Sequence, residues 1–178
     1  MISKILFFVG IICLSLYGFF TVQAHFHQQE LEQELYQPLK SDIPTSGPAK
    51  RRNLKEGDLF GRLEVPRLNL SVMVMEGYAD KTLRLGAGHI PGTPLGIAGH
   101  RDTFFRGLKD IKLNDRIRFT SPEGTSEYRV VATKIVHPKD TSVLEDDVSD
   151  EHMTLVTCYP FFYIGPAPKR FIVEAVKN

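Results

Sequence analysis

A cysteine and an arginine near the C-terminus flank one loop, and the sequence places both ends of that loop in β-strands. Residues 153–157 and 171–176 have the apolar and β-branched composition of strands, whereas residues 159–168 contain three prolines and a glycine and cannot form a helix. Cys158 therefore lies at a strand end and faces Arg170 across the loop. A thiol in that position can be exposed to a substrate while a sheet holds its backbone.

The number of cysteines supports a chemical use for this thiol. The chain has two, Cys13 and Cys158, and Cys13 falls in an apolar N-terminal run, so no disulfide can form within the C-terminal domain. The N-terminus, considered below, predicts that this domain faces an oxidising compartment, where an unpaired thiol without a use is a liability. Cys158 is therefore a candidate nucleophile, and an unreactive, buried cysteine is the alternative.

A nucleophilic thiol needs a proton-transfer partner and a group that stabilises the oxyanion it creates. Four of the six histidines lie away from the N-terminal region: His89, His100, His137 and His152. His100 is the best placed, because it follows Gly-Ile-Ala-Gly, a strand end of small residues that allows close backbone approach. His89, in a loop rich in glycine and proline, is the second candidate. Asp102 either orients the imidazole of His100 or pairs with Arg106.

The elements that position these residues are short strands separated by turns. The 178 residues include 14 glycines and 11 prolines with β-type runs between them, which predicts an all-β domain. Besides the two segments already described, strands are predicted at residues 59–65, 70–75, 96–98, 116–120 and 127–136, and helical turns at residues 80–85 and 103–108. Seven or eight strands in about 125 residues predict a barrel or a sandwich. The formal net charge of +1 gives no reason to expect binding to nucleic acid.

The N-terminus predicts a membrane anchor. Residues 5–24 contain no charged side chain and are preceded by Lys4. About 20 residues at about 1.5 Å each match a hydrocarbon core about 30 Å thick. Residues 1–4 should stay in the cytoplasm, so a single span would place the rest of the chain outside the cell membrane. A cleaved signal peptide is the alternative, since Val22-Gln23-Ala24 resembles a cleavage site, although the apolar run is longer than usual.

Residues 25–53 are predicted to be a juxtamembrane segment followed by a linker. Residues 25–37 could extend the helix, whereas the prolines at 38, 44 and 48, with serine and glycine between them, cannot. The basic run at residues 50–52 is interpreted as a solvated linker end, with contact to lipid head groups or a polyanionic wall as the alternative. The folded domain then covers residues 54–178.

Two segments of this domain resemble a known family. Gly-His-Arg-Asp-Thr-Phe-Phe, which contains His100, and Thr-Leu-Val-Thr-Cys-Tyr-Pro with the following Gly-Pro-Ala-Pro-Lys-Arg-Phe-Ile-Val resemble the sortases, membrane-anchored cysteine transpeptidases. The second segment is most similar to class D members, and the resemblance covers residues 54–178. It implies an eight-stranded β-barrel with short helical turns, with Cys158 at the end of strand seven and Arg170 in strand eight.

The resemblance also implies roles for individual residues. Cys158 would be the nucleophile, His100 the general acid and base, and Arg170 the cation beside the thioester and its oxyanion. Arginine suits that place because its planar guanidinium is always charged and donates from several N–H groups.

The substrate groove is implied to lie around the cysteine. Thr157 matches a family position that shapes the groove. The loop that follows is crowded with aromatic residues, of which Tyr159 and Phe161 are predicted to line a pocket for the apolar residues of the substrate. Packing of these rings beneath the loop is the alternative.

The implied reaction has two halves. Cys158 cleaves a sorting signal of the Leu-Pro-x-Thr-(Gly/Ala) type after threonine and forms a thioester, and an amine of a peptidoglycan precursor then takes the acyl group. The partners would be secreted proteins that carry the signal. The resemblance implies no organic cofactor, and no metal is predicted, because the acidic run at residues 145–151 is interpreted as a solvated loop.

Two other classes of protein stay open. One is another cysteine enzyme of the cell wall, such as an L,D-transpeptidase, although the Ser-x-Gly-Cys neighbourhood expected there is missing. The other is a non-catalytic module that binds wall or protein on a membrane tether. The sequence does not identify the residue after threonine in the signal, the acceptor amine or the substrate proteins.

Overall fold

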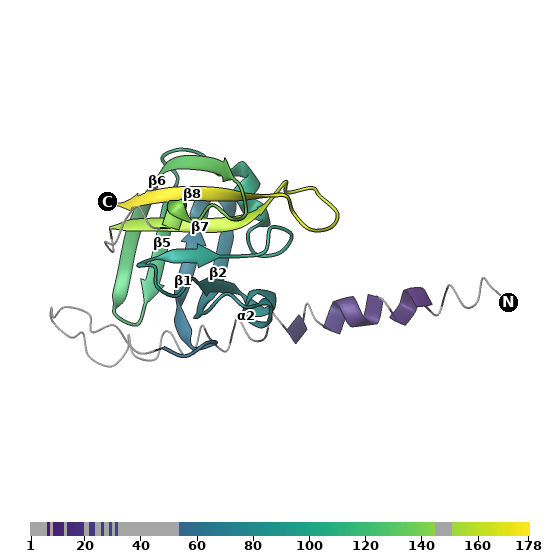
Figure 1. The fold of residues 1–178 in the computed structure, drawn as a ribbon. Coiled ribbons are helices and arrows are strands. Elements are labelled where there is room, and N and C mark those ends of the chain that lie inside the picture. Colours follow the sequence, from purple (N-terminus) through teal and green to yellow (C-terminus); the bar gives the residue numbers. More distant parts are fainter. Residues whose placement is uncertain are drawn as a thin grey trace.

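The structure, a computed structural model, describes residues 54–144 and 151–178, together with residues 7, 9–12, 14–19, 22–23, 26, 29 and 31 of a helical N-terminal segment. In this described part, eight strands close into one barrel in the order β1-β2-β3-β4-β7-β8-β6-β5 (Figure 1). The strands are β1 (Leu59–Val65), β2 (Leu70–Glu76), β3 (Ala87–His89), β4 (Gly96–Ala98), β5 (Arg116–Ser121), β6 (Gly124–Val136), β7 (His152–Tyr159) and β8 (Lys169–Lys177). The predicted eight-stranded, all-β barrel is confirmed.

Short helical elements connect some of these strands. They are η1 (Pro66–Leu68), α2 (Asp80–Leu85), η2 (Arg106–Asp110) and η3 (Ser142–Leu144). The helical turn predicted at residues 80–85 is confirmed as α2. The one predicted at residues 103–108 lies slightly later, in η2, because residues 101–105 first form the turn that leads away from β4.

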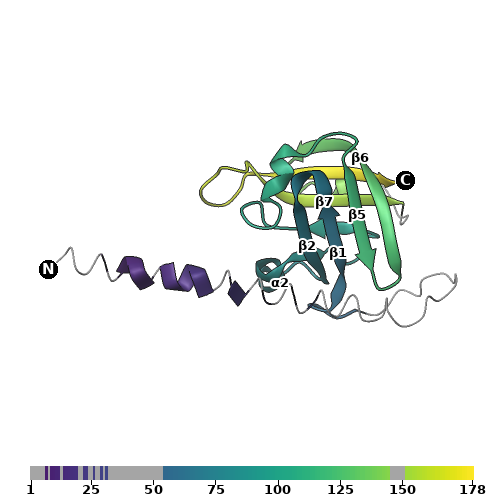
Figure 2. The same ribbon diagram turned by 180° about the vertical axis from the view of Figure 1, so that it is seen from behind.

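Two of the strand pairs are parallel, and they determine which distant segments meet. β2 pairs with β3 and β4 pairs with β7 in parallel, whereas the remaining neighbours, including β7 and β8, are antiparallel. Parallel neighbours need a crossover, and the chain between β4 and β7 builds β5 and β6 on the far side of the barrel (Figure 2). The crossover brings the segment around His100 back beside the segment around Cys158.

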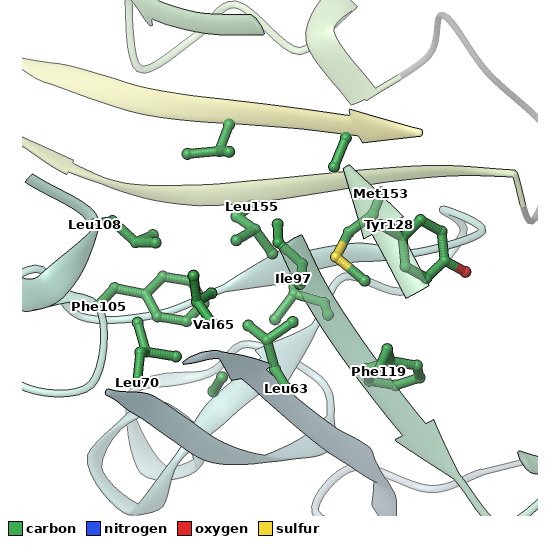
Figure 3. Packing of buried hydrophobic residues seen from close by; sticks show 14 of the residues in the cluster. Leu63, Val65, Leu70, Ile97, Phe105, Leu108, Phe119, Tyr128, Met153 and Leu155 are labelled. Atoms are coloured by element: carbon green, nitrogen blue, oxygen red, sulfur yellow. The ribbon is translucent and has the colours of Figure 1, made fainter. Parts of the chain in front are cut away.

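The barrel interior is filled by apolar side chains that alternate along the strands. In β1, burial alternates at every residue, with Leu63 and Val65 fully buried, as expected for strands with a single face in the core. Figure 3 shows side chains from several strands meeting in this core, with Phe105 lying at one end beside Leu70 and Leu108. Phe105 is fully buried, so the segment that follows β4 is fastened to the core immediately after His100.

A second apolar cluster lies apart from the main core. It consists of Leu59, Met73, Met75 and the partly buried Leu85, together with Leu31 of the N-terminal segment. Leu31 is 6% exposed, so at least this position of the N-terminal segment packs against the domain. The described residues at 26, 29 and 31 are helical, in keeping with a helix that continues past residue 25.

The structure does not test the predicted membrane anchor. Among the described residues, no helix has both the length and the apolar character needed to cross a membrane. Part of the predicted anchor at residues 5–24 and most of the predicted linker at 25–53 lie outside the described residues, as do residues 145–150 of the acidic run.

Candidate active site

Strands β7 and β8 place Cys158 and Arg170 on one face of the barrel wall. The two residues are direct partners in the antiparallel register of these strands, so their side chains project to the same side. Met153, Leu155 and Thr157 are 0–2% exposed and point into the barrel, which leaves the intervening residues and Cys158 on the outer face. The thiol and the guanidinium therefore share the outer surface, as the loop between two predicted strands indicated.

The end of β4 places His100 beside the same strand. Beyond the last residue of β4, the backbone N–H of Gly99 donates to Val156 O at 3.1 Å. The carbonyl oxygen of Gly99 accepts a hydrogen bond of 2.7 Å from the hydroxyl of Thr157, which is buried. Because Gly99 is fastened to the residue that precedes Cys158, the next residue, His100, is brought level with the cysteine.

Close packing explains why a glycine follows β4 at position 99. A Cβ atom at Gly99 would lie 2.7 Å from the ring of Phe105, a distance that a real side chain does not adopt. The backbone N–H of Phe105 also donates to His100 O at 3.0 Å and closes the turn. The glycine thus allows Phe105 to enter the core directly beneath the histidine.

Neither the imidazole of His100 nor the thiol of Cys158 forms a hydrogen bond within residues 54–144 and 151–178, and both side chains are partly exposed. The guanidinium of Arg170 donates through Nη1 to the carbonyl oxygens of Ala167 at 3.4 Å and Lys169 at 3.1 Å. A thiol, an imidazole and a guanidinium therefore lie close together through the pairing of β4 with β7 and of β7 with β8, a set of groups that could act as nucleophile, proton-transfer group and cation.

Neither of the two interactions predicted for Asp102, with His100 or with Arg106, forms among the described residues. Its side chain is exposed and forms no hydrogen bond or ion pair with His100 or Arg106 there.

His89, the second candidate, is engaged elsewhere. It is 7% exposed, its Nδ1 lies 2.7 Å from a carboxylate oxygen of Glu76, and its Nε2 lies 3.1 Å from the carbonyl oxygen of Thr93. Its ring also stacks on Phe60 with centroids 4.0 Å apart. Since both ring nitrogens face hydrogen-bond acceptors, the geometry favours a structural role for His89 and a chemical one for His100.

The aromatic residues after the cysteine divide into two groups. Tyr159 and Phe161 pack with Phe171, with ring centroids between 5.3 and 6.4 Å apart, at the base of the loop. Phe162 and Ile164 at the loop tip are 76% and 101% exposed. The rings of Tyr159 and Phe161 thus pack at the base of the loop, and contact with a substrate stays a prediction.

Arg101 is a residue for which the sequence pattern indicated no role. It follows His100 directly, and its guanidinium binds carbonyl oxygens of the β7–β8 loop. The one signal available was a long cation beside the candidate base, but its partners are backbone atoms, which leave no mark in a sequence.

Two cavities of the described structure lie away from the candidate site. Two cavities of about 430 and 180 Å³ lie elsewhere in the described structure, and neither is lined by Cys158, His100 or Arg170. Among the described residues, no three His, Cys, Asp or Glu side chains are grouped closely enough to hold a metal ion.

Comparison with known proteins agrees with this geometry. Residues 63–178 match the family model described as "Sortase domain". Sortase D of Bacillus subtilis (strain 168) is 36% identical over 124 residues, which are 66% of this chain and 63% of that protein, so the chain spans less than two thirds of its relative.

Solved structures show the same fold. A Sortase D5 transpeptidase of Clostridium perfringens superimposes with a TM-score of 0.70 at 21% identity and covers 88% of this chain and 99% of its own. A Clostridium perfringens sortase C with the C-terminal cell wall sorting motif has a TM-score of 0.63 at 23% identity and covers 88% and 89%.

Proposed function

The chain belongs to the sortase family, and we therefore propose that it is a membrane-anchored cysteine transpeptidase of the class D type. The observation that carries this proposal is the pairing of Cys158 with Arg170 across β7 and β8, with His100 tethered to the same strand through Gly99. Strand pairing thus brings His100, from a distant part of the chain, level with Cys158 and Arg170.

In the first half of the proposed reaction, the sulfur of Cys158 attacks the backbone carbonyl carbon of the threonine in a Leu-Pro-x-Thr signal. The thiol proton passes to His100, and an S–C bond forms. The C–N bond to the next residue then breaks, and its amine leaves with the proton held by His100. In the second half, His100 accepts a proton from an incoming amine, which displaces the sulfur and restores the thiol.

Arg170 would stabilise the negative oxygen that appears in both halves. A guanidinium has five N–H donors, and the hydrogen bonds to Ala167 and Lys169 use only Nη1. Donors therefore remain for an oxyanion next to Cys158, and the fixed charge needs no proton from solvent. The same fork could also bind carbonyl oxygens of the signal.

The groove would be built around these groups. Tyr159 follows the cysteine directly and packs against Phe161, and both rings would contact apolar residues of the signal. Thr157 is 2% exposed, so it would shape the groove through its hydrogen bond to Gly99 and not through its own surface. The packing of both rings against Phe171 would keep them in place.

The proposed partners are secreted proteins that carry a Leu-Pro-x-Thr signal and a peptidoglycan precursor that supplies the acceptor amine. The sortase C structure with a sorting motif supports a peptide of this class as the ligand. The apolar run at residues 5–24 would hold the domain at the outer side of the cell membrane. Protease added to protoplasts should then remove the domain, and protection of residues 54–178 would contradict this topology.

Peptide cleavage by the full chain in mild detergent tests the catalytic proposal. Cys158→Ala should abolish cleavage of a Leu-Pro-x-Thr peptide, and Arg170→Lys should be severely impaired because a single ammonium cannot replace the fork. His100→Ala should be inactive, while His89→Ala is the matched control that keeps activity. An active His100→Ala beside an inactive His89→Ala would refute the choice of base. Cleavage by Cys158→Ala would refute Cys158 as the nucleophile, and absence of cleavage by the wild type would favour the non-catalytic module.

A further inference from the structure

The loop between β7 and β8 joins Cys158 to Arg170 but has little structure of its own. It projects beyond the end of the barrel in two opposite views (Figures 1 and 2). Within residues 54–144 and 151–178, no backbone-to-backbone hydrogen bond involves residues 160–168. A loop without such bonds must be held by side chains if it is to keep one conformation.

Arg101 supplies these bonds from the opposite side of the site. Its Nη1 donates to the carbonyl oxygen of Pro160 at 3.0 Å, and its Nη2 donates to those of Tyr163 at 2.6 Å and Gly165 at 3.3 Å. Its guanidinium carbon also lies 5.7 Å from the centroid of the Tyr163 ring. One side chain therefore holds the start, the middle and the later part of the loop.

We propose that Arg101 is a positioning residue that fastens the β7–β8 loop and thereby fixes one wall of the substrate groove. The inference deepens the proposed function and rests on it, because the groove matters only if Cys158 acts on a peptide. Within the described residues, the Arg101 side chain forms no hydrogen bond with Cys158 or Arg170; it acts through the backbone that links them. Arg101 directly follows His100, so its hydrogen bonds join the His100 segment to the β7–β8 loop, and the peptide must lie between these two segments. We call this link the strap.

The number and geometry of the contacts explain why the residue is an arginine. Three carbonyl oxygens converge on one planar fork, which presents several fixed N–H donors. A lysine ammonium is a compact point charge and could reach one of these oxygens but not span all three. Arg101→Lys should therefore hold the loop only partly, and Arg101→Gln should release it.

The test uses the full chain in detergent with a fluorogenic Leu-Pro-x-Thr peptide. Arg101→Gln should lower kcat/KM by at least about tenfold, mainly through a higher KM, because groove misplacement weakens peptide binding and orientation. Arg101→Lys should fall between Arg101→Gln and the wild type. The rate at which iodoacetamide alkylates Cys158 should stay within about twofold of wild type, because Arg101 does not contact the thiol.

Limited proteolysis reports on the loop without any need for activity. Chymotrypsin cuts after aromatic residues such as Phe162 and Tyr163, and release of the loop in Arg101→Gln should make this cut at least about fivefold faster. Arg106→Gln is the matched control, because Arg106 is an exposed arginine of the same connection and its side chain makes no hydrogen bond within the described residues. It should behave as wild type in both assays.

The outcomes separate this inference from the proposed function. Unchanged chymotrypsin cleavage in Arg101→Gln would overturn the strap, and so would a loss confined to kcat together with slower alkylation of Cys158. If the wild type cleaves no Leu-Pro-x-Thr peptide, the proposed function fails. The proteolysis result would still decide whether Arg101 holds the loop.

Discussion

Asp115 offers a quantitative test of how this fold is held together. The residue is 8% exposed, and its carboxylate accepts hydrogen bonds from Nε of Arg67 at 2.5 Å, Nη2 of Arg67 at 2.6 Å and the backbone N–H of Lys112 at 2.8 Å. The hydrogen bond from Arg67 is the main reason that the pKa of Asp115 is lowered, and burial opposes it. The interaction joins η1 to the turn before β5.

Asp115→Asn keeps the size of the side chain but removes its charge and replaces one accepting oxygen with an N–H₂ group. Either one of the two hydrogen bonds from Arg67 is lost, or the backbone N–H of Lys112 loses its acceptor. A hydrogen bond to a charged group contributes about 1.5–3 kcal/mol, and a buried donor left unpaired costs about 1–3 kcal/mol. Because the Arg67 side chain is 42% exposed, we take the lower ends and expect the free energy of unfolding to fall by about 2–3 kcal/mol.

The effect should depend on pH. The pKa of Asp115 is lower in the folded than in the unfolded chain, so the ionised carboxylate stabilises the fold fully above the unfolded pKa of about 3.9. That stabilisation is lost as the pH falls through the folded pKa, and the difference between wild type and Asp115→Asn should shrink below about pH 4.

Urea unfolding of the full chain in non-ionic detergent measures this difference. Far-UV circular dichroism is the suitable signal, because the chain contains no tryptophan. Asp110→Asn is the matched control: its carboxylate is 60% exposed and forms a hydrogen-bonded ion pair with Lys109 at the surface, so a change below about 0.5 kcal/mol is expected. A loss below about 0.5 kcal/mol for Asp115→Asn at pH 7, or a loss that is constant from pH 7 to pH 3, would refute the reasoning.

Two further substitutions test the site and its surroundings. Thr157→Val removes the 2.7 Å hydrogen bond to Gly99 O, so we expect the free energy of unfolding in urea to fall by about 1–2 kcal/mol. The kcat/KM of peptide cleavage should fall by at least about tenfold. Wild-type kinetics would contradict the role of this hydrogen bond in placing His100. His89→Ala leaves the partly buried Glu76 without its partner and should cost about 2–3 kcal/mol in urea unfolding. It should keep kcat/KM within about threefold of wild type at 25 °C, and wild-type stability would show that the pair with Glu76 contributes little.

The parts of the structure that follow from local pattern could be predicted from the sequence. Strands β1 and β4 and helix α2 have the predicted limits, because alternation and flanking turn residues are local signals. Strand β3 was missed, since Ala-Gly-His has no strand pattern and is ordered by parallel pairing with β2. A Cβ atom at Gly88 would lie 2.2 Å from the carbonyl oxygen of Gly77, so close backbone approach is what this segment requires.

The same division holds for the site. The loop between two strands placed Cys158 opposite Arg170, and the register of β7 and β8 agrees. The position of His100 depends on the parallel pairing of β4 with β7, which joins residues far apart in the chain. The contacts of Arg101 could not be predicted at all, because they depend on where backbone carbonyl oxygens of a distant loop lie in space.

The cluster around Leu31 has a practical consequence for preparing the protein. Leu59, Met73 and Met75 are at most 9% exposed while Leu31 covers them. A fragment trimmed to residues 54–178 would lack Leu31 and would expose more of this apolar cluster to water. An exposed apolar patch promotes self-association. A soluble fragment for crystallisation should therefore begin before Leu31 and retain its cover, or carry polar replacements at the two methionines.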